Sequence, residues 1–331
     1  MVESQSVEEI SSRYVRFAEN EARGRSPLYE ELALRVAKDR SVLEFLFELP
    51  FAKQQPNLLF AAVRHVCGTP RSWGHFHRLL ASRPDEIREV MLKRRTQTNE
   101  PARCATLLPL LALLPQPLAL LEVGASAGLC LIPDRYSYRY NGVKVVPSSN
   151  VGAVPPTFSC KTNPQTPIPK TNVEVAWRMG LDLEPVSLHD NEQVAWLETL
   201  VWPGEENRLA LLRQALDVAR RDPPRVRRGD LRTDVPTLAA QAPTGATLVV
   251  FHSAVLAYIP SEQDREEFAK TVCQLDAVWI SNEMPGFILG STERLRKPCS
   301  PGEFLLARDQ EAIACTDPRG RSLRWFGNSD K

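Results

Sequence analysis

The sequence lacks an excess of charge of either sign. It contains 41 Lys+Arg against 40 Asp+Glu, so its 331 residues carry a formal net charge of +1. Such a balance creates no field that would attract a polyanion. We therefore expect neither a nucleic-acid nor a membrane partner. The sequence does not indicate an oligomeric state.

The seven cysteines lack a pattern. They are odd in number, widely spaced and contain no Cys-x-x-Cys pair, so we expect neither a disulfide framework nor a zinc site. His75 and His77 would point to different sides of a helix, and we expect no metal there. The polar, acidic start MVESQSVEEI has neither the basic nor the apolar region of a secretory signal. These features favour a cytoplasmic location.

A long hydrophobic run is also missing. Residues 105–121 form the most apolar segment, but they include three prolines and fall short of the roughly 20 residues that span a bilayer. They predict a buried helix followed by a buried strand.

The chain changes character near residue 116. Before it, only helical patterns occur, with a capping box at Ser6-x-x-Glu9 and a second helix start at Ser26-Pro27. After it, apolar strand patterns alternate with helical ones, which favours a parallel sheet covered by helices. We predict an all-helical N-terminal region, 1–115, and a Rossmann-like α/β domain, 116–331, with a mostly parallel sheet. The expected parallel strands are 118–123, 174–181, 225–228, 247–251 and 277–281.

Two further features complete the predicted domain. Strand patterns at 304–308, 312–316 and 322–326 indicate an antiparallel C-terminal edge. Residues 134–172 form an insertion, which we expect to contain a hairpin around Asn141-Gly142 and a structureless proline-rich loop.

The turn after the strand at 118–123 admits two interpretations. In the first, Gly124-x-Ser126-x-Gly128 is the nucleophile elbow of a serine hydrolase, with Asp182 or Asp230 and then His252 completing a triad. Only helices precede this strand, no His-Gly-Gly loop occurs upstream, and His252 ends a strand instead of lying on a late loop. These features disfavour the hydrolase.

In the second interpretation the turn binds a cofactor. Small residues let a ligand approach the backbone, and a helix beginning at 128–132 would favour anionic or polar groups. Glu122-x-Gly124-x-Ser126-x-Gly128 resembles the first motif of class I S-adenosylmethionine-dependent methyltransferases, an acidic residue and then Gly-x-Gly-x-Gly, with Ser126 in place of the middle glycine.

This resemblance implies roles for residues at the ends of the later strands. Asp182 would bind the ribose hydroxyls, and Asp230 would lie near the adenine amino group. His252 and Ser253 would face the methyl acceptor, with Glu283 as a weaker candidate of the same kind. By default, however, a histidine at the end of a buried strand such as His252 is a hydrogen-bonded core residue. The residues expected to hold the cofactor are Glu122, Gly124, Ala125, Ser126, Gly128, Asp182 and Asp230.

The segment Gln97-Thr98-Asn99-Glu100 also has two interpretations. It precedes Pro101 and an apolar helix, so its side chains can cap that helix. Alternatively, Thr98, Asn99 and Glu100 contact the substrate. The sequence leaves both open.

Several motifs together resemble an uncharacterised bacterial family, domain of unknown function 2332. They are RRTQTNE at 94–100, LEVGASAGL at 121–129, DRY at 134–136, VWP at 201–203 and FHSAVLAY at 251–258. Family members usually have asparagine where this chain has Cys130. The resemblance implies a methyltransferase-like fold but no established reaction.

The leading expectation is therefore methyl transfer from S-adenosylmethionine to a small molecule. A Rossmann-like binding protein without catalysis and a hydrolase using Ser126 are the alternatives. The sequence does not name the methyl acceptor.

Overall fold

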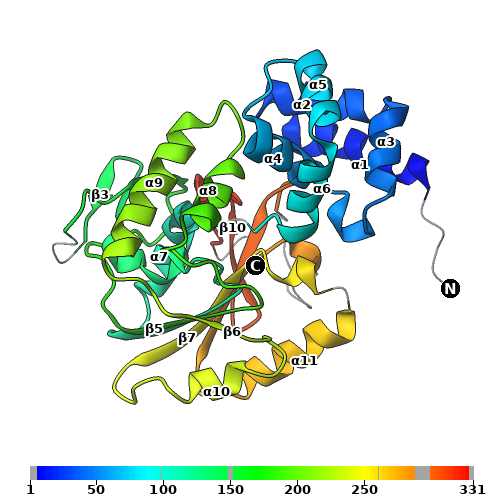
Figure 1. Ribbon diagram of the computed structural model, residues 1–331. Coiled ribbons are helices and arrows are strands. Elements are labelled where there is room, and N and C mark those ends of the chain that lie inside the picture. Colours follow the sequence, from blue (N-terminus) through cyan, green and yellow to red (C-terminus); the bar gives the residue numbers. More distant parts are fainter. Residues whose placement is uncertain (1–5, 98, 148–151, 260, 288–298, 328–331) are drawn as a thin grey trace. The chain divides into compact units, whose positions relative to one another are not determined.

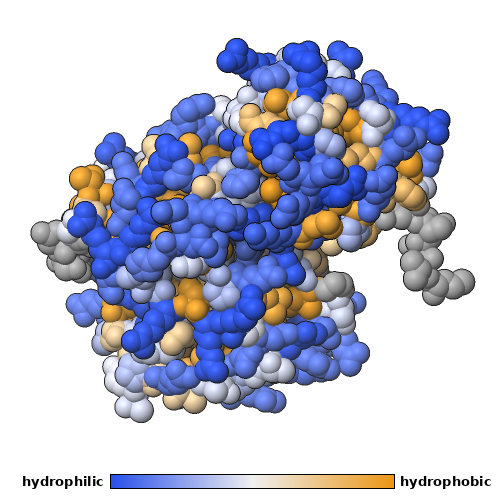
Figure 2. Space-filling model, in the orientation of Figure 1, coloured by the Kyte–Doolittle hydropathy of each residue, from blue (hydrophilic) through white to orange (hydrophobic). Residues whose placement is uncertain are grey.

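A computed structural model describes residues 6–97, 99–147, 152–259, 261–287 and 299–327 (Figure 1). The chain folds into two compact units. The helical unit comprises Met1–Thr98 and Glu192–Ala210, and the sheet unit comprises Asn99–Asn191 and Leu211–Lys331. Among the described residues, no helix is both long and apolar enough to span a bilayer. On the face drawn in Figure 2, described apolar side chains form small groups among hydrophilic ones.

The helical unit begins as the capping residues predict. Ser6 and Glu9 form a complete capping box, and Ser26 accepts the backbone N–H of Tyr29 ahead of Pro27. Serine oxygens satisfy amides that have no partner within the helix, which fixes where each helix starts. The helices are α1 (Val7–Phe17), α2 (Pro27–Val36), α3 (Arg40–Phe47), α4 (Pro56–Cys67), α5 (Trp73–Ser82), α6 (Pro84–Lys93) and α8 (Asn191–Thr199).

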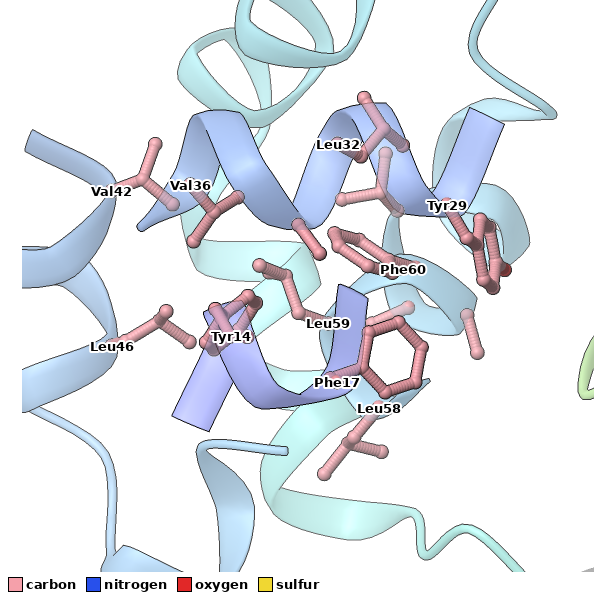
Figure 3. Packing of buried hydrophobic residues seen from close by; sticks show 14 of the residues in the cluster. Tyr14, Phe17, Tyr29, Leu32, Val36, Val42, Leu46, Leu58, Leu59 and Phe60 are labelled. Atoms are coloured by element: carbon pink, nitrogen blue, oxygen red, sulfur yellow. The ribbon is translucent and has the colours of Figure 1, made fainter. Parts of the chain in front are cut away.

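Phe60 on α4 centres the core of this unit. Its ring lies 4.9 to 6.1 Å from the rings of Tyr14, Phe17, Tyr29 and Phe76. Figure 3 shows Tyr14, Phe17, Tyr29 and Phe60 gathered between the helices. Burial of such rings is a main source of stability in a helical core.

A later segment completes the same core. The Trp202 ring lies 5.5 Å from both Phe17 and Tyr29, and Arg64 donates to the carbonyls of Thr199 and Val201 at 2.8 and 2.7 Å. Residues 192–210 therefore fold with the helical unit, whereas 99–115 fold with the sheet unit. This division differs from the predicted boundary at 115/116. Contacts between residues 192–210 and the first helices join segments far apart in the sequence, and local patterns do not predict such contacts.

In the described chain, eleven strands form one mixed sheet in the order β3-β2-β4-β11-β10-β9-β8-β7-β1-β5-β6. Strand β1 (Leu118–Val123) is buried along its whole length and lies parallel to both of its neighbours, β5 and β7. The other strands are β2 (Ser137–Tyr140), β3 (Val143–Val145), β4 (Thr157–Thr162), β5 (Val175–Asp182), β6 (Val226–Arg228), β7 (Thr247–Ser253), β8 (Val278–Glu283), β9 (Phe304–Arg308), β10 (Glu311–Thr316) and β11 (Ser322–Trp325).

Helix α7 (Cys104–Leu111) precedes β1. Helices α9 (Glu206–Arg221), α10 (Val235–Ala239) and α11 (Glu262–Cys273) lie in the connections from β5 to β6, from β6 to β7 and from β7 to β8, as the alternation predicts. Helices α10 and α11 pack on one face of the sheet through a shared apolar cluster, and they lie together along the strands in Figure 1. The coarse prediction of an α/β protein with a mostly parallel sheet is thus confirmed.

The predicted edge of the sheet is not where the sheet ends. Strands β9 to β11 are antiparallel to their neighbours as expected, but β11 also pairs in parallel with β4, and β4 with β2. The insertion was expected to contain a structureless loop; instead it supplies β4, in which Phe158 and Cys160 are buried and Ser159 is exposed. This alternation is a strand signal that the surrounding prolines obscure.

One cysteine pair departs from the prediction of no disulfides. Cys299 and Cys315 are bonded, with Cα atoms 5.5 Å apart. The antiparallel pairing of β9 and β10 carries Cys315 back to the segment before β9, and spacing alone does not reveal that approach. Glu303 lies beside the pair.

Candidate functional site

The candidate site is the turn Gly124–Gly128 at the carboxyl end of β1. In the sheet, Val123 pairs with Leu181 of β5 on one side and with His252 of β7 on the other. This register places the turn beside Asp182 and Ser253, the last residues of those two strands. The structure thus brings together residues that are up to 130 positions apart.

The conformation of the turn requires small residues. Gly124 and Gly128 have φ of +72° and +73°, and Ser126 has φ of +50°, a left-handed conformation that strains a serine. A Cβ atom on Gly124 would lie 2.4 Å from Cγ2 of Val255. Close packing of the protein itself therefore requires Gly124 to be glycine.

The backbone amides of the turn are already hydrogen-bonded within the protein. Ser126 donates to Oδ2 of Asp182 at 2.8 Å, and Ala127 donates to Oδ1 of Asn99 at 3.3 Å. The N–H groups of Gly124, Ala125 and Gly128 reach the carbonyls of Leu181, Leu181 and Ala125 at 2.8, 3.2 and 2.7 Å. The turn in this form offers no open set of amides to an anion.

The helix expected at 128–132 is also replaced by a shorter element. Only a 3-10 turn forms, Leu129–Leu131, and it ends at Ile132, where φ is −119° and ψ is 44°. Pro133 follows, and a residue before proline avoids the α conformation. This described segment therefore lacks the predicted helix N-terminus behind the turn. The contribution that such an N-terminus would make to anion binding is also missing there.

Polar atoms without partners gather at this turn. Asn99 Nδ2, Glu122 Oε2 and Ser126 Oγ are buried and have no hydrogen-bond partner among the described residues. The others of this kind in the described chain, Tyr14 OH and Asn57 Oδ1, belong to the helical unit. A buried polar group without a partner destabilises a protein by roughly 1–3 kcal/mol, so three at one turn mark a place where ligand groups would be stabilising.

Burial raises the pKa of Glu122. Its pKa lies well above its ordinary value because burial disfavours the charged form, and Cys130 and Asp182 add to the effect. Arg103 opposes it. The Glu122 carboxyl group therefore holds a proton more tightly than an exposed glutamate does.

His252 and Glu283 occupy the interior beside the turn. His252 is fully buried, its Nδ1 lies 2.7 Å from Oε1 of Glu283, and its Nε2 accepts the indole N–H of Trp279 at 3.0 Å. Both ring nitrogens are thus used within the protein. This arrangement does not support the prediction that His252, or Glu283, faces a methyl acceptor.

The other predicted contacts are distributed around the same edge. Asn99 does not cap the following helix, because its side chain binds the turn instead. Glu100 is buried, and its carbonyl accepts the Cys130 thiol at 3.5 Å. Thr98 lies outside the described residues.

Ser253 and Asp230 also have protein partners. Ser253 accepts from Asn282 Nδ2 at 3.2 Å. The Asp230 carboxylate binds Arg232 at 3.0 Å, and this hydrogen bond holds its pKa below its usual value.

A bacterial family model described as "Uncharacterized protein conserved in bacteria (DUF2332)" matches residues 11–325. The chain belongs to this family. The DUF2332 motifs LEVGASAGL and FHSAVLAY form, respectively, the end of β1 with its turn and the end of β7 with the following 3-10 turn, Leu256–Tyr258. Two of the motifs that predicted the family therefore meet at the candidate site.

Further comparisons add little to the family assignment. No curated protein matches this DUF2332 chain. A crystal structure of a possible exported protein from Bordetella parapertussis is 12% identical, covers 84% of this chain and 71% of its own, and has a TM-score of 0.23. A likeness at this TM-score supports no statement about fold or function.

The geometry disfavours the hydrolase interpretation of the DUF2332 turn. Ser126 Oγ is buried and has no hydrogen-bond partner in the described chain, whereas an elbow serine needs a base within reach. The nitrogens of His252 are both engaged elsewhere.

Two residues of the site escaped the sequence-based prediction. Arg103 donates to the carbonyls of Pro318 and Ser253 at 2.8 and 3.1 Å, and it contributes a positive charge near Glu122. Val255 packs on Gly124. Arg103 belongs to a helical stretch and Val255 has no chemical signature, so no sequence signal distinguishes them.

A separate surface groove of about 390 Å³ does not contain the predicted residues. Its lining residues are Ala153, Val154, Gln214, Asp217, Arg220 and Arg221.

Proposed function

We propose that this DUF2332 chain is an S-adenosylmethionine-dependent methyltransferase acting on a small molecule, with its cofactor at the turn between β1 and β5. The observation that carries the proposal is the group of unpartnered buried polar atoms on Asn99, Glu122 and Ser126. These atoms provide hydrogen-bond donors and acceptors for the hydroxyl and amino groups of a nucleoside-type ligand.

The strand order supports a ligand at this position. Within the sheet, β5 and β6 lie on one side of β1, whereas β7 and β8 lie on the other, all five being parallel. The direction of winding therefore changes at β1, and open α/β sheets bind ligands outside the carboxyl ends of strands at such a point. On this basis we interpret the domain as Rossmann-like and methyltransferase-like.

The charges favour a ligand without phosphate groups. The turn amides are used within the protein, and the carboxyl groups of Glu122 and Asp182 lie at the turn. A dinucleotide or nucleotide needs a phosphate cradle, whereas S-adenosylmethionine carries a positive sulfonium and no phosphate. The bound cofactor would supply the reactive methyl group.

The residues of the chain fit this ligand. The carboxylate of Asp182 lies at the turn and accepts the N–H groups of Ser126 and Glu184, both at 2.8 Å. A carboxylate with two acceptor oxygens suits a pair of neighbouring hydroxyls, so Asp182 would take the ribose hydroxyls. Glu122, Ser126 and Asn99 would bind the remaining polar groups, and positioning of donor and acceptor would provide most of the rate enhancement.

A second candidate is a binding protein of the same fold without catalysis. The observation that favours it is the complete engagement of His252 inside the protein, which removes the predicted base. Detection of bound ligand without methyl transfer to any acceptor would support this candidate.

Calorimetric titration with S-adenosylhomocysteine tests the site through Asn99. The variant Asn99→Ala removes the unpartnered amide, and we expect it to bind about three- to tenfold more weakly than the wild type, the effect of one hydrogen bond. Asn207→Ala, at an exposed position of the helical unit, is the control and should bind like the wild type. Equal affinity of all three proteins would contradict the proposed contact.

A further inference from the structure

A chain of buried hydrogen bonds links four residues behind the candidate site. The Trp279 indole donates to His252 Nε2 at 3.0 Å, and His252 Nδ1 lies 2.7 Å from Glu283 Oε1. The two oxygens of Glu283 also accept the backbone N–H of Val255 at 2.9 and 3.1 Å. Trp279 is 7% exposed, His252 0% and Glu283 1%, so water does not compete for these bonds.

Elementary chemistry determines which group donates in each of these hydrogen bonds. An indole N–H only donates, so Nε2 of His252 must accept and carries no hydrogen. The remaining hydrogen of a neutral imidazole is then on Nδ1, where it points to the Glu283 carboxylate. The chain therefore runs from Trp279 through His252 to Glu283, which also receives the Val255 amide.

The far end of this chain reaches the glycine turn. Val255 follows β7, and its side chain occupies the space where a Cβ atom on Gly124 would lie. Ala254, just before it, has φ of +59°, a conformation that a non-glycine residue adopts only when neighbouring contacts hold it. The carboxylate of Glu283 provides such a contact through the adjacent amide.

We infer that Trp279, His252 and Glu283 are positioning residues that hold Val255 against Gly124 and thereby fix the ligand-binding form of the turn. The polar side chains at the ends of β7 and β8 then act through the backbone and not on a substrate. The effect on ligand affinity rests on the proposed function, whereas the effect on the Val255 loop does not.

Amide exchange at Val255 tests the positional part. In Glu283→Ala the amide loses its acceptor, and we expect its exchange to accelerate at least tenfold, the loss expected for a hydrogen bond to a charged group. Glu283→Gln keeps an oxygen at the Oε1 position, which accepts from both His252 and Val255, but places an NH2 group at the Oε2 position, so it should restore part of the protection. Unchanged exchange in a folded Glu283→Ala protein would overturn the inference.

If Glu283→Ala does not fold, Trp279→Phe tests the other end of this hydrogen-bond chain. It retains an aromatic ring but removes the indole donor, whereas the Glu283 carboxylate still keeps the proton on Nδ1. The nitrogen-15 shift of Nε2 should then move toward the value of an unprotonated imidazole nitrogen without a hydrogen bond, and the Nδ1–H shift should stay in place. Trp325→Phe, in β11, is the matched control and should leave the shifts unchanged. A wild-type His252 protonated on Nε2, or an Nε2 shift that stays in place in Trp279→Phe, would contradict the deduced proton order.

Affinity for S-adenosylhomocysteine tests the functional part. We expect Glu283→Ala to bind about tenfold more weakly and Glu283→Gln to bind within about threefold of the wild type. If the wild type does not bind this ligand, the proposed function fails. Amide exchange at Val255 and the nitrogen-15 shifts of His252 still decide whether the hydrogen-bond chain exists. If the wild type binds and Glu283→Ala binds equally well, the hydrogen-bond chain does not determine the ligand-binding form of the turn.

Discussion

Asp182 fastens the glycine turn to the neighbouring strand through the backbone of Ser126. Its Oδ2 accepts the Ser126 N–H at 2.8 Å, while its Oδ1 accepts the N–H of Glu184 at the same distance. A single carboxylate therefore holds together the loops that follow β1 and β5. This arrangement gives Asp182 a structural role in addition to the ligand contact that we propose.

Replacing this carboxylate should weaken the fold. In Asp182→Asn one oxygen becomes an amide nitrogen that faces a backbone N–H, so we expect the free energy of unfolding to fall by about 1–3 kcal/mol. Urea denaturation measures the change, with Asp217→Asn at an exposed position as the control. Equal stability of the two variants would show that Asp182 does not hold the turn.

Ser126→Gly should stabilise the protein. Glycine adopts φ of +50° without the strain of a serine, and the change also removes a buried hydroxyl without a partner. We expect a gain of about 1 kcal/mol in the free energy of unfolding. Ser126→Ala removes the hydroxyl but keeps the Cβ atom, so it should lack the part of the gain that comes from the relieved backbone conformation. A loss of stability in Ser126→Gly would contradict the strained conformation.

Gly124 cannot be enlarged without harm to the fold. The positive φ and the approach of Val255 both oppose a side chain, so Gly124→Ala should lower the free energy of unfolding by roughly 2–4 kcal/mol. Gly245→Ala, where space around the added Cβ is open, provides the control in the same thermal or urea denaturation. This variant therefore tests packing, and it is unsuitable as a test of cofactor binding alone.

Glu122 makes stability depend on pH. Its pKa is raised above 4.5 in the folded protein, so the folded state binds the proton more tightly than the unfolded state. The stabilisation is complete below about pH 4.5 and is lost as the pH rises through the folded-state pKa, at up to about 1.4 kcal/mol per pH unit. Glu122→Gln stays neutral and removes this dependence.

Denaturation of the wild type and of Glu122→Gln across this pH range measures the difference. Relative to the wild type, the variant should become more stable as the pH increases above 4.5. Glu174→Gln, at the exposed amino end of β5, should follow the wild type. Parallel curves for all three proteins would contradict the raised pKa.

Local sequence patterns predict the positions of helices and strands in this fold better than they predict which of these elements contact one another. The apolar run of β1 and the capping residues Ser6 and Ser26 determine local structure, so they could be recognised in the sequence. The role of Trp202 in the helical core depends on contacts nearly two hundred residues away, and no local pattern encodes it.

In the candidate site, too, features that depend on local sequence could be predicted, and features that depend on tertiary contacts could not. Glu122, the turn and Asp182 follow directly from strand ends and their alternation, and the structure does place them together. The engagement of His252 depends on Trp279, which the pairing of β7 with β8 brings beside it. Burial and proton direction at His252 are thus properties of the assembled sheet.

The central claim is that the turn binds a nucleoside-type cofactor without phosphate groups. Calorimetric titration of the wild-type protein with S-adenosylhomocysteine, and in parallel with ADP, tests it most directly. The account predicts saturable binding of S-adenosylhomocysteine in the micromolar range and at least tenfold weaker binding of ADP. No binding of S-adenosylhomocysteine at millimolar concentration, or equal binding of ADP, would contradict it.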